Sequence, residues 1–200
     1  STESASWLAF GLEFPKGTIY DALKAKGIPY RLYNDVNNIY TDRQGTSMLG
    51  GVAQVRSLRN IGNFPTVAVE NLESDLKKPY PYQYTFIEPH YGSVPGDFSG
   101  GSSQHPKDGT NGGENLIKAV YETIRNSSVW EESLLIITYD EHGGFYDSVV
   151  PGIAVPPGDN PNNDLNTHGF KFDRYGFRVP AVVISPWIEK GSIDHTIYDH

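Results

Sequence analysis

One stretch of this chain points to its fold: Leu134-Leu135-Ile136-Ile137-Thr138-Tyr139-Asp140-Glu141-His142-Gly143-Gly144. It begins as a continuous apolar run of strand length, which is typical of a strand buried on both faces of a parallel sheet. Two carboxylates and an imidazole follow immediately. Open α/β sheets hold their ligands at this position, beyond the carboxyl ends of the strands.

The charges at the end of this run have two interpretations. Two adjacent carboxylates beside an imidazole repel one another if they are left unpaired, and a divalent cation removes that conflict. Gly143-Gly144 would let the backbone turn tightly around such an ion. The alternative is a polar strand end whose charges simply face water. The apolar run before the turn and the two glycines after it favour a metal site.

Helical and strand-like segments alternate along the rest of the chain. The clearest helix is Glu114 to Arg125, where Leu116, Val120 and Ile124 recur at helical spacing. Further helices are expected at 18–26, 53–59 and 69–77, and further strands at 28–33, 83–87 and 179–185. Residues 91–112 are expected to form a long loop, of the kind that often carries function. The alternation predicts the α/β class, with a doubly wound, mostly parallel sheet and helices on both faces.

Composition excludes several classes of function. The chain has 200 residues, which fits one domain or a large piece of one. Cysteine is absent, which excludes disulfides, thiolate metal sites and cysteine catalysis. The net charge of −8, without any Lys/Arg cluster, argues against nucleic acid as a partner. We expect no transmembrane segment and no signal peptide within these residues, because neither a long apolar run nor a basic start followed by an apolar stretch is present.

Four blocks of sequence carry a resemblance to a known family. They are residues 86–92, the pair His105-Pro106 with residues 113–122 after it, residues 138–147, and residues 173–187. Together they resemble the phosphoesterase family that contains the bacterial and plant phosphatidylcholine-type phospholipases C and related acid phosphatases. The resemblance runs from about Thr18 to His200.

The resemblance implies a fold, a chemistry and a set of site residues. The family belongs to the alkaline-phosphatase superfamily and hydrolyses phosphate esters. A divalent metal would be held by Asp140 and Glu141, with His105 near the phosphate. His142 could be a further ligand, a hydrogen-bond partner of the ligands or a phosphate contact, the last two being favoured. The metal would polarise the phosphoryl group, and histidines would stabilise charge or protonate the leaving group. Calcium, manganese, zinc and iron all suit such ligands, so the metal stays open.

Substrate and location follow from the resemblance only in outline. A phospholipid and a small soluble phosphate ester are equal candidates for the substrate. A secreted or periplasmic location is favoured by the family.

Two family elements are missing from these 200 residues: a Glu-Asn metal-binding pair and the loop that supplies a Thr or Ser nucleophile. Residues 1–200 are therefore expected to be the C-terminal portion of a phosphoesterase catalytic domain, belonging to a parent enzyme. By itself such a piece would have little or no turnover. The alternative is an incomplete or degenerate member that only binds metal or phosphate. Ser148 also replaces a histidine that many members carry.

Other polar residues allow a functional or a structural role. Arg178 is expected either to bind phosphate or, more plainly, to form an ion pair with Asp173. Glu88 is expected to be a site carboxylate or the partner of the turn that follows it, the second being favoured. His90 is interpreted as a turn residue, and Glu114 as a first-turn carboxylate that the helix dipole favours.

Overall fold

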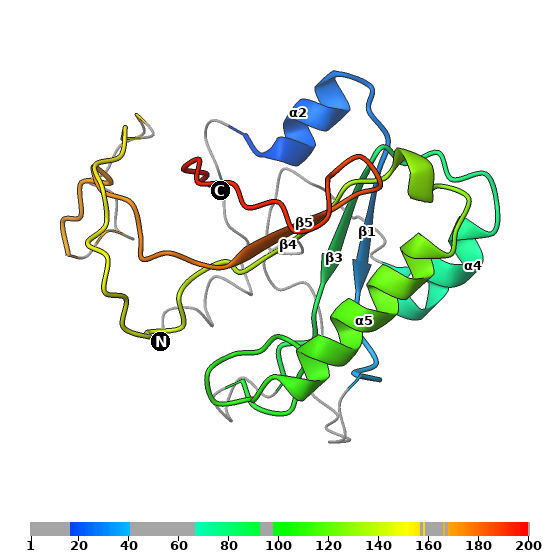
Figure 1. Ribbon diagram of the computed structural model, residues 1–200, viewed down its shortest axis with the longest axis horizontal. Helices are drawn as coiled ribbons and strands as arrows, with labels where there is room; N and C mark the ends of the chain where they lie inside the picture. Colours follow the sequence, from blue (N-terminus) through cyan, green and yellow to red (C-terminus); the bar gives the residue numbers. More distant parts are fainter. Residues whose placement is uncertain are drawn as a thin grey trace. The chain divides into compact units, whose positions relative to one another are not determined.

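The structure is a computed structural model that describes residues 17–40, 67–92, 98–156, 158, 166 and 168–199. The chain divides into two compact units, Ser1–Ser133 and Leu134–His200, and each is described by itself (Figure 1). The helix expected at 53–59 lies outside the described residues.

A parallel three-stranded sheet forms the centre of the first unit. Its strands are β1 (Tyr30–Asn34), β2 (Val67–Ala68) and β3 (Tyr84–Glu88), in the order β2-β1-β3. β1 pairs with β3 along its whole length, from Tyr30 opposite Tyr84 to Asn34 opposite Glu88. The carboxyl ends of β1 and β3 therefore meet at one edge.

Helix α2 (Ile19–Ala25) covers one face of this sheet. It begins with a capping box, in which the Thr18 backbone N–H donates to the Asp21 carboxylate at 2.7 Å and the Asp21 N–H donates to the Thr18 hydroxyl. Tyr20 is buried from this helix against Leu32 of β1. The side chains around this pair are Leu23, Tyr30, Tyr84 and Phe86.

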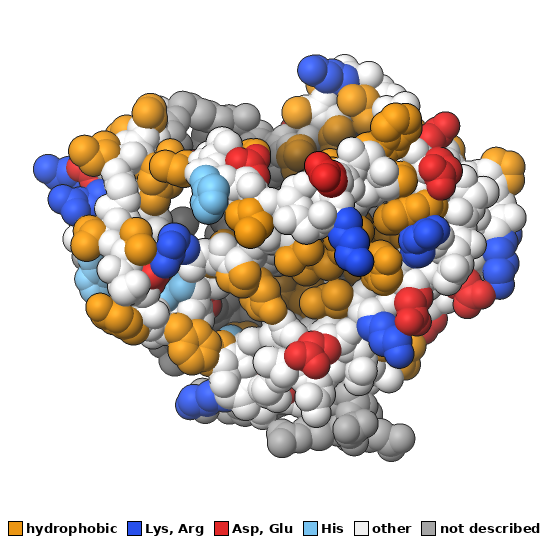
Figure 2. All heavy atoms as spheres, in the orientation of Figure 1, with side chains coloured by type: hydrophobic (Ala, Val, Ile, Leu, Met, Phe, Trp, Pro, Cys, Tyr) orange, Lys and Arg blue, Asp and Glu red, His pale blue; other side chains and the backbone are white. Residues whose placement is uncertain are grey.

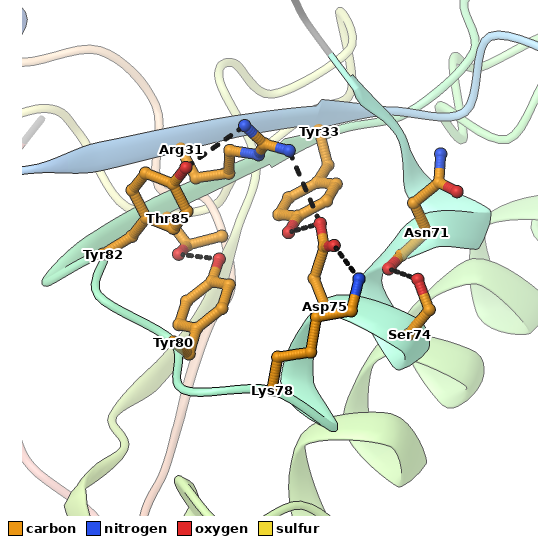
Figure 3. Close-up of polar contacts among 9 residues, drawn as sticks. All are labelled: Arg31, Tyr33, Asn71, Ser74, Asp75, Lys78, Tyr80, Tyr82 and Thr85. Atoms are coloured by element: carbon orange, nitrogen blue, oxygen red, sulfur yellow. Dashed lines mark hydrogen bonds and ion pairs between the residues drawn. The ribbon is translucent and has the colours of Figure 1, made fainter.

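The opposite face carries a 3₁₀ turn, η2 (Val69–Asn71), which runs directly into helix α4 (Leu72–Leu76). Successive side chains of a strand alternate between faces, so Arg31 and Tyr33 point away from α2. Both reach Asp75 of α4: the Tyr33 hydroxyl donates to its carboxylate at 2.8 Å, and Arg31 Nη2 lies 3.5 Å from it (Figure 3). The Arg31 guanidinium also lies over the rings of Tyr33 and Tyr82, with its Cζ 5.7 and 5.2 Å from the two centroids. The first unit thus has helices on both faces of its sheet.

The long helix α5 (Asn111–Arg125) packs against α4 through the predicted apolar stripe, of which Leu116 and Val120 are buried. It begins three residues before the expected start at Glu114. Gly112 and Gly113 lie in this added turn, so close to the preceding loop that a Cβ at either would collide with it. The 3₁₀ turn η4 (Trp130–Glu132) follows, with Trp130 packed edge-on against Tyr121.

The second unit holds β4 (Leu135–Thr138) and β5 (Ala181–Ile184) as an antiparallel pair, from Leu135 opposite Ile184 to Thr138 opposite Ala181. Both strands were expected, but the prediction that they are buried strands of a parallel sheet is wrong for this unit. Ile136 is 57% exposed and Val182 53%. The described residues of this unit contain no helix that could cover the pair.

The α/β class with a parallel sheet is confirmed in the first unit. Helix α4 with the turn before it matches the helix expected at 69–77, and β1 and β3 match the expected strands to within two residues. Among the described residues no helix is long and apolar enough to cross a membrane. Lys and Arg side chains lie scattered among acidic ones on the face drawn in Figure 2.

Candidate functional site

The acidic turn Asp140-Glu141-His142 follows β4 directly, as the sequence predicts. A Glu141 carboxylate oxygen accepts a hydrogen bond from the Gly143 N–H at 2.9 Å and lies 3.5 Å from His142 Nδ1. Gly143 and Gly144 both have positive φ angles, of 68° and 76°, which is the conformation that the two glycines were expected to supply. Asp140 and Glu141 are exposed, while His142 is half-buried.

The donor atoms of this turn suit a divalent cation in kind but not in number. Carboxylate oxygens are ligands for hard cations. Calcium, for example, takes about six to eight oxygen ligands. Within the described part of the chain, no group of three or more His, Asp or Glu residues is arranged to hold a metal ion. The described residues therefore do not complete a metal site by themselves.

A cavity of about 420 Å³ adjoins the turn within the second unit. Arg178 and Asp147 form a two-pronged ion pair on its wall, with Nε and Nη2 each 2.8 Å from a carboxylate oxygen. These hydrogen bonds from Arg178 hold the pKa of Asp147 well below its usual range. The residues lining the cavity are His142, Phe145, Tyr146, Asp147, Arg178, Val179 and Pro180.

The ion pair corrects one prediction. Arg178 was expected to pair with Asp173, but Asp147 is its partner. Asp147 lies in the same sequence block as the acidic turn, so the pair joins two of the blocks that carry the family resemblance.

His105 lies in the first unit, on the loop that runs from β3 to α5. Its ring rests against that of Phe98, with centroids 4.8 Å apart. Its backbone N–H donates to the Ser103 hydroxyl at 3.3 Å, and its carbonyl accepts from the Asp108 N–H at 2.7 Å. His105 Nδ1 is buried and has no hydrogen-bond partner among the described residues. The structure thus places His105 in one unit, and Asp140, Glu141 and His142 in the other.

A buried polar cluster that the sequence did not predict lies where β1 and β3 end. The Ser102 hydroxyl donates to the Asp35 carboxylate at 2.7 Å and accepts from the His90 backbone N–H at 3.0 Å. All three residues are buried, with exposed fractions of 3%, 0% and 1%. Asp, Ser and His are also the residue types of a hydrolytic triad. Here the serine bonds the histidine backbone and is shielded from solvent, so the cluster is not arranged for nucleophilic attack.

Burial shifts the pKa values of two members of this cluster, Asp35 and His90. Burial raises the pKa of Asp35, against hydrogen bonds from Ser102 and the Ile39 N–H that lower it. Burial lowers the pKa of His90, although Asp35 and Asp108 favour its charged form. The Gly92 N–H donates to His90 Nδ1 at 2.8 Å, so this nitrogen carries no proton. His90 is a turn residue as expected, and it is also a buried neutral imidazole.

Glu88 and Glu114 both have the structural roles that the sequence favours. Glu88 is buried and accepts a hydrogen bond from the Tyr91 hydroxyl at 3.0 Å, which confirms it as a partner of the turn that follows. Glu114 lies in the first turn of α5, as expected.

Comparison with known proteins places the chain in a family. Residues 10–200 match the model of the phosphoesterase family. Non-specific phospholipase C6 of Arabidopsis thaliana is 36% identical over 183 residues, which cover 90% of this chain and 32% of that protein. Non-specific phospholipase C1 of the same plant is 35% identical over 184 residues, or 91% of this chain and 32% of that protein.

A bacterial protein is similar over a shorter region. Phospholipase C B of Mycobacterium tuberculosis is 36% identical over 109 residues, which cover 49% of this chain and 20% of that protein. The chain spans about a third of the length of the plant relatives. Since the family model matches nearly the whole chain and the resemblance seen in the sequence is confirmed, the chain belongs to the phosphoesterase family.

Proposed function

We propose that residues 1–200 are the C-terminal portion of the catalytic domain of a metal-dependent phosphate-ester hydrolase, of the phospholipase C or acid-phosphatase type. Family membership over residues 10–200 is the observation that carries the proposal. The share of its plant relatives that the chain spans, about a third, supports the view that further catalytic elements lie elsewhere. The alkaline-phosphatase-like, doubly wound fold is part of the same proposal.

In this proposal Asp140 and Glu141 supply one side of the metal site, and residues outside the 200 supply the other. When bound, the metal polarises the phosphoryl group and activates the attacking hydroxyl. The adjacency of the two carboxylates after β4 supports their role, because a shared cation relieves their repulsion.

His142 is proposed to hold or donate a proton beside the phosphate. Its Nδ1 lies 3.5 Å from the Glu141 carboxylate, so the imidazole is placed directly beside the acidic pair. Its ring packs against Phe177, with centroids 4.7 Å apart, and this contact restricts its orientation. A histidine held in this way is suited to protonate a leaving alkoxide.

His105 is proposed to stabilise the charge that develops on the phosphate. The half-buried position of its ring against Phe98 supports this role, since hydrogen bonds to an anion gain strength as water is excluded.

A second candidate is favoured by one observation, the incomplete donor set around Asp140 and Glu141. In that case the protein binds metal or phosphate without turnover. Recovery of about 100–200 residues upstream in the gene separates the two candidates, because the hydrolase requires a Glu-Asn element and a Thr or Ser nucleophile there.

The proposal is tested with the full-length protein, using p-nitrophenyl phosphate and a phosphatidylcholine analogue in parallel. Asp140→Asn and Glu141→Gln should each lower kcat by at least about a hundredfold, and a chelator should have a similar effect. Asp173→Asn, which removes an exposed carboxylate in the same unit, is the matched control and should retain activity. Wild-type rates in both site variants would refute the assignment. Residues 1–200 alone should show little or no turnover.

The relative rates on the two substrates decide between a phospholipid and a small soluble ester. Phospholipase C is the name that the relatives carry, and it favours the phospholipid. A secreted or periplasmic location remains a proposal from the family resemblance, to be checked by fractionation of the source cells.

A further inference from the structure

His105 is held by hydrogen bonds of its backbone N–H and carbonyl, to the Ser103 hydroxyl and the Asp108 N–H. Among the described residues, its Nδ1 has no hydrogen-bond partner, and its ring contact is with Phe98. Catalytic histidines are commonly oriented by a hydrogen bond to the second ring nitrogen. Here the ring contact with Phe98 and the backbone of the loop together orient the residue.

Asp108 joins the two ends of the loop 100–108, which contains His105. Its carboxylate accepts hydrogen bonds from two consecutive backbone N–H groups, those of Gly100 and Gly101. Its own N–H donates to the His105 carbonyl at 2.7 Å. The carboxylate bonds reach eight and seven positions back along the chain, so they span His105 rather than form a local turn.

The loop closed in this way is attached to the end of the sheet. Ser102, three residues before His105, donates its N–H to the His90 carbonyl at 2.8 Å and its hydroxyl to buried Asp35. Gly101 lies so close to the turn after β3 that a Cβ there would collide with the His90 carbonyl oxygen. Gly100 and Gly101, which donate to the Asp108 carboxylate, are thus held against the end of the sheet. Because Asp108 also donates to the His105 carbonyl, it fixes the position of His105 relative to them.

We propose that Asp108 is a positioning residue for His105, acting through the backbone of the 100–108 loop and not by contact with substrate. This inference rests on the proposed function, in which His105 contacts the phosphate. A displacement of about 1 Å of a catalytic group can cost about a hundredfold in rate. Loss of the hydrogen bonds to the Asp108 carboxylate should therefore lower kcat more than it raises KM.

The test uses Asp108→Asn, Asp108→Glu and Asp21→Asn in the full-length protein, with and without His105→Ala. The asparagine keeps the size of the side chain but loses one of the two acceptor oxygens, so kcat should fall at least about tenfold. The glutamate variant keeps the carboxylate and should recover part of the rate. Asp21→Asn is the control. It disrupts the cap of α2, which lies far from Asp108 in the sequence, and it should leave kcat unchanged.

The double variant with His105→Ala separates positioning from general stability. If Asp108 acts through His105, Asp108→Asn should lower kcat no further once His105 is removed. An equal fold-loss in both backgrounds, or equal effects of Asp108→Asn and Asp21→Asn, would overturn the inference.

A second measurement keeps the test independent of turnover. In the full-length protein with isotope-labelled histidine, the imidazole resonances of His105 should shift in Asp108→Asn and stay in place in Asp21→Asn. If His105→Ala has wild-type activity, or if the full-length protein hydrolyses no phosphate ester, the proposed function fails and these resonances alone decide the inference. Unchanged His105 resonances in Asp108→Asn would overturn it.

Discussion

Replacement of Ser102 by alanine tests whether the buried cluster at the ends of β1 and β3 holds the first unit together. The hydroxyl makes two buried hydrogen bonds, donating to the Asp35 carboxylate at 2.7 Å and accepting from the His90 N–H at 3.0 Å. A hydrogen bond to a charged group contributes about 1.5–3 kcal/mol, and a buried N–H left without a partner costs about 1–3 kcal/mol. Because the two effects overlap, their sum is an upper limit, and we expect Ser102→Ala to lower the free energy of unfolding by about 2–4 kcal/mol.

The assay is urea unfolding followed by the fluorescence of Trp130, in a background where Trp7 and Trp187 are replaced by phenylalanine. Trp130 is buried in the first unit, so its emission reports that unit. The matched control is Ser74→Ala. The Ser74 hydroxyl is exposed and donates to the Asn71 carbonyl, and its removal should lower the free energy of unfolding by no more than about 0.5 kcal/mol.

A loss below about 1 kcal/mol in Ser102→Ala, with an unchanged dependence on urea, would refute the reasoning. It would mean that water replaces the hydroxyl at no cost, and that the cluster is not sealed from solvent. A loss of similar size in the control would refute it as well.

Three further predictions concern the same unit. Because burial lowers the pKa of His90, the unfolded protein binds a proton there that the folded protein does not. The stability that His90 contributes should therefore be complete above its ordinary pKa of about 6.5 and decline as the pH falls below it. Between pH 7.5 and 5.5, urea unfolding should show a smaller loss of stability in His90→Gln than in wild type, and equal losses would contradict this. Gly101→Ala should lower the midpoint of thermal unfolding more than Gly109→Ala, as measured by circular dichroism. A Cβ at the first position meets the His90 carbonyl, whereas at the second it meets no atom and costs only the strain of a positive φ of 83°. Thr18→Ala should cost about 1 kcal/mol through loss of the cap of α2, measured by urea unfolding, and a cost near zero would contradict the capping box.

Local sequence patterns predicted those parts of the fold that depend on neighbouring residues. The apolar stripe of α5 and the stop of α2 near Gly27 are both readable from spacing and residue type. The turn at Asp140–Gly144 was predicted for the same reason, since two adjacent glycines permit the positive φ angles that it uses.

The parts that depend on distant residues were not predicted. An apolar run such as 134–137 suits a parallel or an antiparallel strand equally, and its pairing with β5 is a tertiary choice. Ser102 gives no local signal of its bond to Asp35, which lies 67 positions away in the sequence. Arg178 had several acidic residues within reach, and only the fold selects Asp147.

The hydrogen bond between Asp35 and Ser102 also limits the order in which parts of the chain can fold during synthesis. Asp35 leaves the ribosome long before its partner, since 67 positions separate the two. Translation adds about 5–20 residues per second, so the gap lasts seconds. Throughout that interval water must solvate the carboxylate, and the sheet edge that later encloses it has to stay open. The hydrogen bond between Ser102 and Asp35 can therefore form only after the loop following β3 has emerged, and an early pause in translation would prolong the interval in which Asp35 faces water.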